Sequence, residues 1–152
     1  MANNLGIDFG THELRLAILD EGQPRLLGTV IPMWKAARLD HSGYAIPLKV
    51  ELDDEQPIRL GSASLSRADL ATRIFSHVRN EAEKILGDSV TGCVIGITSQ
   101  AGNLHRQILR SATRKAGFRS FGLINETLAV AWSQSPTPEK DRQFLIYNMG
   151  AK

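Results

Sequence analysis

The sequence has little of several features that mark specialised classes of protein. Its 152 residues include one cysteine, Cys93, so no disulfide can form within the chain. Cys93 lies in the apolar run Val90–Ile97, where we expect a buried, unreactive thiol rather than a nucleophile or a ligand. No apolar run approaches the roughly 20 residues that span a bilayer, and the N-terminus lacks a secretory signal pattern. We therefore expect a reducing, cytoplasmic location and no membrane partner.

An excess of charge of one sign is also missing. The net charge is +2 with 22% charged residues, so bulk electrostatics do not indicate a polyanion-binding protein. Arg106, Arg110 and Arg114 follow one another at helical spacing, and we interpret them as the solvated face of a helix opposite Leu104 and Ile108. The four histidines show no metal-ligand spacing. Nucleic acid is therefore disfavoured as a partner, and the composition is that of a soluble globular domain.

The first part of the chain predicts antiparallel strands. Two apolar runs, Leu5–Phe9 and Leu14–Leu19, flank a turn that contains Gly10, and this pattern is typical of a β-hairpin. Leu26–Ile31 supplies a third strand of the same meander. Residues 32–61 are broken up by prolines and acidic residues, and we expect a small irregular excursion or subdomain there.

Helical periodicity begins after the excursion. Ser66 and Asp69 resemble a capping box, and Gly87 is placed to end that helix. Asn103 and Gly117 are placed to begin and to end a second helix. The remaining segments predict the strands Cys93–Thr98, Phe121–Ile124 and Phe144–Tyr147 and the short helix Glu126–Ser133.

This order of elements predicts a fold class. Three strands of meander followed by alternating helices and strands indicate an α/β lobe over residues 1–152, with a mixed five-stranded sheet and helices on its faces. The same order defines the ribonuclease-H-like arrangement that actin-like ATPases, sugar kinases and several nucleases share.

The turn after the first strand is a candidate phosphate site. Gly10 has no side chain, so backbone N–H groups and the Thr11 hydroxyl can approach a phosphate. Asp8, at the end of the strand, would hold hydrated Mg²⁺ beside the phosphate oxygens. An ordinary turn has the same pattern, so the motif alone leaves both readings open.

The segment Val94–Trp132, together with the opening hairpin, resembles the first lobe of the nucleotide-binding domain of DnaK-type heat-shock chaperones, which are actin-like ATPases. The matching pieces are the pair Arg106-Gln107 on a helix and the Ala116-Gly117 stop. A third piece, residues 124–131, reads Ile-Asn-Glu-Thr-Leu-Ala-Val-Ala where the family has Ile-Asn-Glu-Pro-Thr-Ala-Ala-Ala. The resemblance covers most of the chain apart from residues 32–54.

The resemblance implies roles for individual residues. Asp8, Gly10 and Thr11 match the first phosphate motif, in which Asp8 would hold Mg²⁺ through water. Glu126 matches the acid that positions the hydrolytic water, and Arg106 matches the arginine that senses the nucleotide state. The implied cofactor is ATP or ADP with Mg²⁺.

The sequence departs from the family pattern at catalytic positions. Tyr147–Gly150 matches the start of the second phosphate motif, but Asn148 stands where the family has a catalytic aspartate. An amide carries no negative charge to hold Mg²⁺-bound water or to accept a proton. His12 replaces a threonine of the nucleotide-binding turn, Thr98 replaces a switch proline, and Thr127 replaces the proline after the glutamate.

Further positions bear on the site. Gly150 belongs to the expected nucleotide-binding set, and the chain stops at Lys152, where the second glycine-rich turn of the family begins. We expect the second lobe, which grips the adenosine, to be absent. Lys35 is a candidate counterpart of the family's catalytic lysine.

These observations predict a degenerate or truncated chaperone-like lobe that binds ATP weakly and serves as an interaction module for a protein partner or a missing second lobe. One alternative is the functional half of an ATP-hydrolysing chaperone domain cut from a longer chain. Another is a ribonuclease-H-like, metal-dependent nuclease in which Asp8 and Glu126 share a metal, although Asn148 removes an acid that two-metal chemistry needs.

Overall fold

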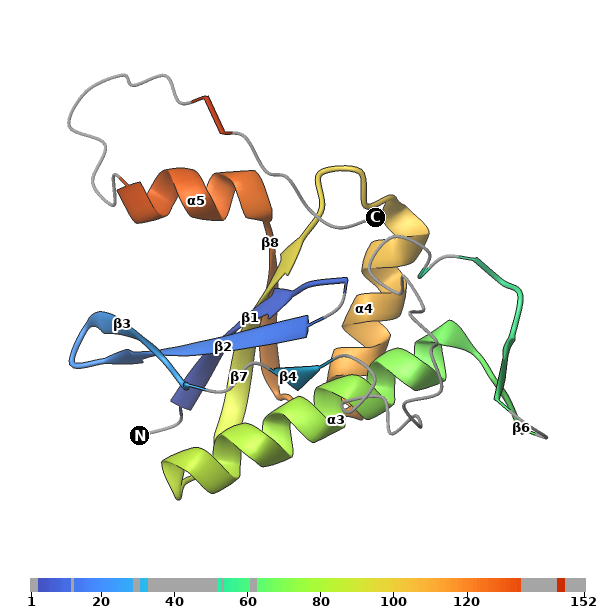
Figure 1. The fold of residues 1–152 in the computed structure, drawn as a ribbon, viewed down its shortest axis with the longest axis horizontal. Coiled ribbons are helices and arrows are strands. Elements are labelled where there is room, and N and C mark those ends of the chain that lie inside the picture. Colours follow the sequence, from blue (N-terminus) through green and yellow to red (C-terminus); the bar gives the residue numbers. More distant parts are fainter. Residues whose placement is uncertain are drawn as a thin grey trace.

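The structure is a computed structural model of the chain, and it describes residues 3–11, 13–28, 31–32, 52, 54–60, 63–134 and 145–146. Strands dominate the first third, and helices alternate with strands after it (Figure 1). In chain order the elements are β1 (Asn3–Phe9), β2 (Glu13–Asp20), β3 (Gln23–Leu26), β4 (Ile31–Pro32), β5 (Ile58–Leu60), β6 (Ala63–Leu65), α3 (Arg67–Leu86), β7 (Val90–Ile97), α4 (Asn103–Lys115), β8 (Ser120–Asn125) and α5 (Glu126–Gln134).

The main sheet has the strand order β3-β2-β1-β7-β8, with the two-residue strand β4 also paired to β2. β1 runs antiparallel to β2 and parallel to β7, and β7 runs parallel to β8. This is the mixed, five-stranded arrangement expected from the sequence, with β4 as an additional short strand. Because β1, β7 and β8 are parallel, their carboxyl ends meet at one edge of the sheet.

Alternation along β1 separates the two faces of the sheet. Leu5, Ile7 and Phe9 point into the core, where each is at most 3% exposed. Asn4, Gly6 and Asp8 point to the opposite face, because side chains along a strand alternate. The partners on β2 alternate in step, so that the core-facing pairs are Leu5 with Ile18, Ile7 with Leu16 and Phe9 with Leu14.

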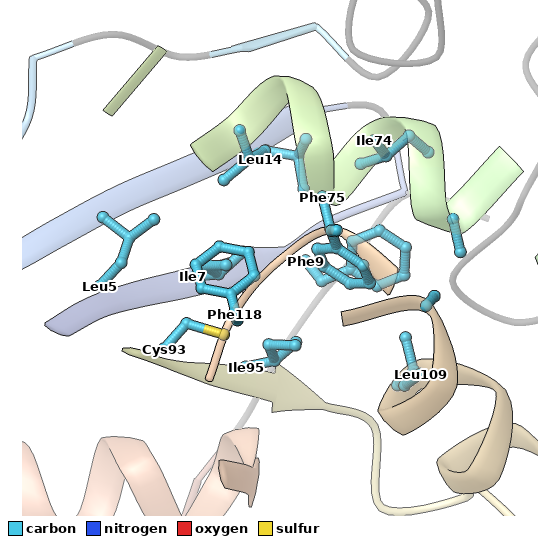
Figure 2. Packing of buried hydrophobic residues seen from close by; sticks show 14 of the residues in the cluster. Leu5, Ile7, Phe9, Leu14, Ile74, Phe75, Cys93, Ile95, Leu109 and Phe118 are labelled. Atoms are coloured by element: carbon cyan, nitrogen blue, oxygen red, sulfur yellow. The ribbon is translucent and has the colours of Figure 1, made fainter. Parts of the chain in front are cut away.

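The core lies between the sheet and the helices α3 and α4 (Figure 2). Phe9 of β1 and Phe75 of α3 pack with their ring centroids 5.5 Å apart in a tilted arrangement. Phe118, in the connection from α4 to β8, fills the core beside them and is 2% exposed. At the other side of the sheet α5 follows β8, and none of its residues is buried (Figure 1).

Both ends of α3 are fixed as the sequence predicts. The Ser66 hydroxyl accepts a hydrogen bond from the backbone N–H of Asp69 at 3.0 Å and donates one to the Asp69 carboxylate at 2.7 Å. Gly87 ends the helix in the left-handed conformation, with φ of 65°, and its N–H donates to the Glu83 carbonyl. The capping box and the glycine stop are therefore confirmed.

The start of α4 differs from the prediction by one residue. Gly102, not Asn103, is the N-cap, and Asn103 is already the first helical residue. The reason is the first helical hydrogen bond, which runs from the Arg106 N–H to the Gly102 carbonyl at 3.1 Å. Gly117 follows the helix with φ of 92°, so its predicted place at the end of the helix is confirmed.

The third predicted strand, Leu26–Ile31, is also corrected. The structure contains two separate pieces instead, β3 ending at Leu26 and β4 beginning at Ile31. Gly28 lies between them with φ of 72°, a left-handed conformation that interrupts an extended strand. The strands β2 and β3 are joined by Glu21 and Gly22, both with positive φ, as a tight hairpin turn requires.

The excursion is described in part. β5 and β6 pair antiparallel as a small separate sheet, and Leu52 and Ile58 are buried. Of the predicted last strand, residues 144–147, only Leu145 and Ile146 are described, and neither lies in a strand. Leu145 is 99% exposed, and at these two positions the prediction of a strand is wrong.

None of the helices in the described part of the chain is both long and apolar enough to cross a membrane.

The Cys93 thiol offers a test of the core. Cys93 is 3% exposed, and burial raises the pKa of its thiol to about 12 because a thiolate would lose its hydration. Its contribution to the free energy of unfolding is therefore complete below the pKa of roughly 8.5 of an exposed thiol, and it is lost as the pH rises towards about 12. As the pH is raised from about 8.5 to 11, we expect the free energy of unfolding, measured with urea, to fall less for Cys93→Ala than for the wild type. Rapid reaction of the native thiol with a thiol reagent at pH 8 would contradict this placement.

Candidate functional site

Polar side chains and close backbone approaches gather at the carboxyl ends of the three parallel strands. β1 ends at Phe9, β7 at Ile97 and β8 at Asn125, and each is followed by a turn, a loop or a helix start. In open α/β sheets this edge is where ligands bind, since the loops there are free to approach them.

Asp8 lies at this edge on the face opposite the core. Its partner on β2 is Arg15, and its partner on β7 is Gly96. The Nη1 atom of Arg15 lies 3.7 Å from Oδ2 of Asp8, and both side chains are about half exposed. The same guanidinium also contacts the Glu13 carboxylate. Asp8 is therefore accessible to a ligand, but its nearest described partner is a cation.

The turn after β1 requires a glycine. A Cβ atom at Gly10 would lie 2.3 Å from the backbone carbonyl oxygen of Glu13, far inside van der Waals contact. The chain therefore folds back on itself at Gly10 more closely than any other residue would allow. Thr11 follows, partly exposed, and His12 lies outside the described residues.

Glu126 enters the same area from β8. It is the first residue of α5, and a Cβ atom at Gly96 would lie 3.4 Å from Cγ of Glu126, so the Glu126 side chain lies over the glycine. The Oε1 atom of Glu126 is buried. Because Gly96 is also the partner of Asp8 in the sheet, the two predicted acids lie on either side of one glycine. The structure thus brings Asp8 and Glu126 together beside Gly96, and Gly10 follows Asp8 by two residues.

Asn125 sets the direction of the Glu126 segment, a role that the sequence reading missed. Its Oδ1 atom accepts hydrogen bonds from the Thr127 backbone N–H at 3.0 Å and from the Thr127 hydroxyl at 2.6 Å. This is the capping pattern of a helix start, in which an asparagine oxygen satisfies a backbone N–H of the first turn. A proline at position 127 would have neither donor. Thr127 therefore stabilises this helix start through two hydrogen bonds to Asn125 that a proline could not form.

Arg106 holds the loop that follows β7. It is partly buried on α4, and its Nε donates to the Ala101 carbonyl at 3.0 Å. Within that loop the Ala101 N–H donates to the Thr98 carbonyl at 3.2 Å. Arg106 is thus placed at the correct edge of the sheet, and its described hydrogen bond goes to the loop.

Four of the residues proposed from the sequence fall outside the described part of the chain. His12, Asn148 and Gly150 belong to the predicted nucleotide-binding set, and Lys35 is the candidate lysine. Gly96 and Arg15, by contrast, are described residues that the sequence reading did not single out. A count of the hairpin register would have placed Arg15 opposite Asp8.

A phosphate and Mg²⁺ require different groups at this edge of the sheet. A phosphate would be bound by backbone N–H groups of the turn and by the Thr11 hydroxyl. Mg²⁺ prefers oxygen ligands in an octahedral arrangement, usually with several waters. Among the described residues, no three His, Cys, Asp or Glu side chains are grouped so as to hold a metal ion. Of the two acids beside Gly96, Asp8 also faces the Arg15 guanidinium.

A mixed sheet in this order, with Asp8 on β1 and Glu126 at the start of α5 beside Gly96, is consistent with a lobe of the actin-like ATPase class. The family model described as Hsp70 protein matches residues 25–152, which is most of the chain. The chain therefore belongs to the Hsp70 family. The matched range includes Arg106 and Glu126, whereas Asp8 and Gly10 precede it. The assignment of the first turn thus depends on its geometry and on its motif.

The close approach at Gly10 generates a test. We expect Gly10→Ala to destabilise the fold by about 1–3 kcal/mol, because the added carbon would collide with the Glu13 carbonyl oxygen and force the hairpin to shift. Gly6→Ala, on β1 four residues earlier, is the matched control, since its Cβ atom would lie at an ordinary 3.5 Å from the Ala17 carbonyl oxygen. Urea unfolding of both variants measures the difference. Equal midpoints for the two variants would contradict the described turn.

Proposed function

We propose that the chain is a chaperone-type nucleotide-binding lobe that holds the phosphates of ATP or ADP weakly, hydrolyses ATP slowly or not at all, and acts as an interaction module. The observation that carries the proposal is the convergence of Asp8 and Glu126 on one glycine position of the sheet, Gly96. The turn would bind phosphate through its backbone N–H groups and the Thr11 hydroxyl. Glu126 would orient water at the phosphate.

Weak binding follows from the number of contacts available. A phosphate turn on one lobe gives no contact to the base or the ribose, and ligands generally need to bury most of their surface to bind tightly. The described residues form one such lobe. The chain by itself would therefore bind ATP with a dissociation constant above about 10 μM.

Slow hydrolysis follows from Asn148. An amide at this position cannot act as a general base and has no negative charge with which to attract a cation. Loss of a positioned acid or base commonly lowers the rate by a factor of about 10² to 10⁴.

The interaction part of the proposal is supported by uncovered apolar side chains. α5 has no buried residue, and its three large apolar side chains are between 44% and 59% exposed. The face of the sheet opposite the core carries further ones on β2, β3 and β7. Surfaces of this kind commonly mark contacts with another protein segment or domain. The residues are Leu19, Leu26, Val94, Leu128, Val130 and Trp132.

A titration of the ¹⁵N-labelled chain with ATP and Mg²⁺, followed by NMR, tests the proposal. We expect shifts at the amides of Gly10, Thr11 and Gly96, saturating above about 10 μM ligand. Glu126→Gln should leave this affinity within about threefold, because the acid is assigned to water rather than to phosphate. Shifts confined to other surfaces, or none at millimolar ATP, would overturn nucleotide binding at this turn.

The alternative, a functional half of an ATP-hydrolysing domain, draws on the same convergence of acids and predicts turnover. We expect the chain, and the variant Asn148→Asp, to release no measurable phosphate from ATP, since binding is weak and oriented only at the phosphate. Hydrolysis by Asn148→Asp at ordinary enzyme rates of about 1 per second or more would favour the alternative. Metal-dependent nucleic-acid cleavage that Asp8→Asn abolishes would instead support the nuclease reading.

A further inference from the structure

Among the described residues, a cation of the chain itself, Arg15, lies next to the predicted phosphate turn. Arg15 faces Asp8 across the β1–β2 pair, and its Nη1 atom lies 3.7 Å from Oδ2 of Asp8. Glu13, two residues earlier on the same face of β2, contacts the same guanidinium. The two carboxylates therefore hold the guanidinium next to the turn that begins at Gly10.

A guanidinium and Mg²⁺ can each bind phosphate oxygens, but they compete for the position beside Asp8. The planar guanidinium matches a phosphate with two parallel N–H donors. A fixed positive charge within a few ångströms of Asp8 repels a divalent cation from the same carboxylate. Arg15 has five N–H donors, so contacts with Asp8 and Glu13 leave others for a ligand.

We propose that Arg15 occupies the cation position beside the Asp8–Gly10 turn, so that this site takes the phosphate groups of a nucleotide without Mg²⁺. The phosphate half of this inference depends on the proposed function, whereas the exclusion of a metal does not. Arg15 is in this view a specificity residue: it decides whether the metal-free or the metal-bound form of the nucleotide is preferred. Asp8 and Glu13 act as positioning residues for its guanidinium.

The chain contains a matched control for the experiment. Arg25 pairs with Asp20 on the same sheet, with 2.7 Å between Nε and Oδ2, and both side chains are about half exposed, as in the Arg15–Asp8 pair. That pair lies at the end of β2 that is remote from Gly10. Exposed ion pairs contribute little to stability, so we expect both Arg15→Gln and Arg25→Gln to fold with urea midpoints close to that of the wild type.

Mn²⁺ is the probe for metal exclusion, because its unpaired electrons broaden NMR signals of nearby amides. In the wild type and in Arg25→Gln, we expect the amides of Phe9, Gly10 and Gly96 to broaden only weakly with Mn²⁺ alone at low ionic strength. In Arg15→Gln the same amides should broaden at roughly tenfold lower Mn²⁺, since a single charge about 5 Å from a dication changes its affinity by about that factor. Equal broadening in wild type and Arg15→Gln would overturn the assignment of Arg15.

ATP affinity with EDTA and with excess Mg²⁺ is the second measurement. The wild type and Arg25→Gln should bind ATP at least as tightly in EDTA as with Mg²⁺, whereas Arg15→Gln should lose about tenfold in EDTA and become dependent on Mg²⁺. A wild type that loses tenfold or more in EDTA would overturn metal-free selection and leave nucleotide binding intact. If no variant binds ATP under either condition, the proposed function and the phosphate half both fail, and the Mn²⁺ comparison still decides whether Arg15 excludes a metal.

Discussion

The position of β1 in the middle of the sheet is the constraint on which both the core and the candidate site depend. β1 is hydrogen-bonded on both edges, to β2 and to β7, so its register fixes the residues that face each other across three strands. A shift by one residue would exchange Phe9 and Asp8 between the core and the open face. The burial of Leu5, Ile7 and Phe9 against α3 and α4 therefore also fixes Asp8 beside Gly96 and Arg15.

Small residues on the second parallel strand complete this arrangement. Gly96 has no side chain, and the space above it is taken by the Glu126 side chain, which would meet a Cβ atom at 3.4 Å. Glu126 in turn is placed by the helix start that Asn125 caps through two hydrogen bonds from Thr127. Asp8 on β1 and Glu126 at the start of α5 therefore lie close to the same position, because Gly96 on the strand between β1 and β8 has no side chain there.

Much of this could be predicted from the sequence, and the parts that could not have physical reasons. The hairpin, the caps of α3 and the acids Asp8 and Glu126 follow from local patterns, which depend on residues close in the chain. The split of the third strand depends on the backbone of Gly28, which a glycine in a strand-like run does not reveal. The neighbours of Asp8 depend on pairing between strands: β7 is more than 80 residues further along the chain, so its register is set by packing rather than by any local signal. The position of Arg15 could have been predicted in part. Alternation along β2 places Arg15 on the same face as Glu13, but its position opposite Asp8 follows only once the hairpin register is known.

The departures from the family pattern have different physical weight. Thr127 in place of proline changes the donors of one helix start and is satisfied by Asn125, so it preserves the position of Glu126. Asn148 in place of aspartate removes a negative charge, and Arg15 supplies a positive one beside Asp8. Both features make the site less negative. A less negative site retains a divalent cation less well, and a site with its own guanidinium has less need of a divalent cation to bind an anion. In the proposed function, phosphate binding would persist after the loss of metal-assisted hydrolysis, because the glycine turn assigned to the phosphate belongs to the β1–β2 hairpin and does not depend on the catalytic residues.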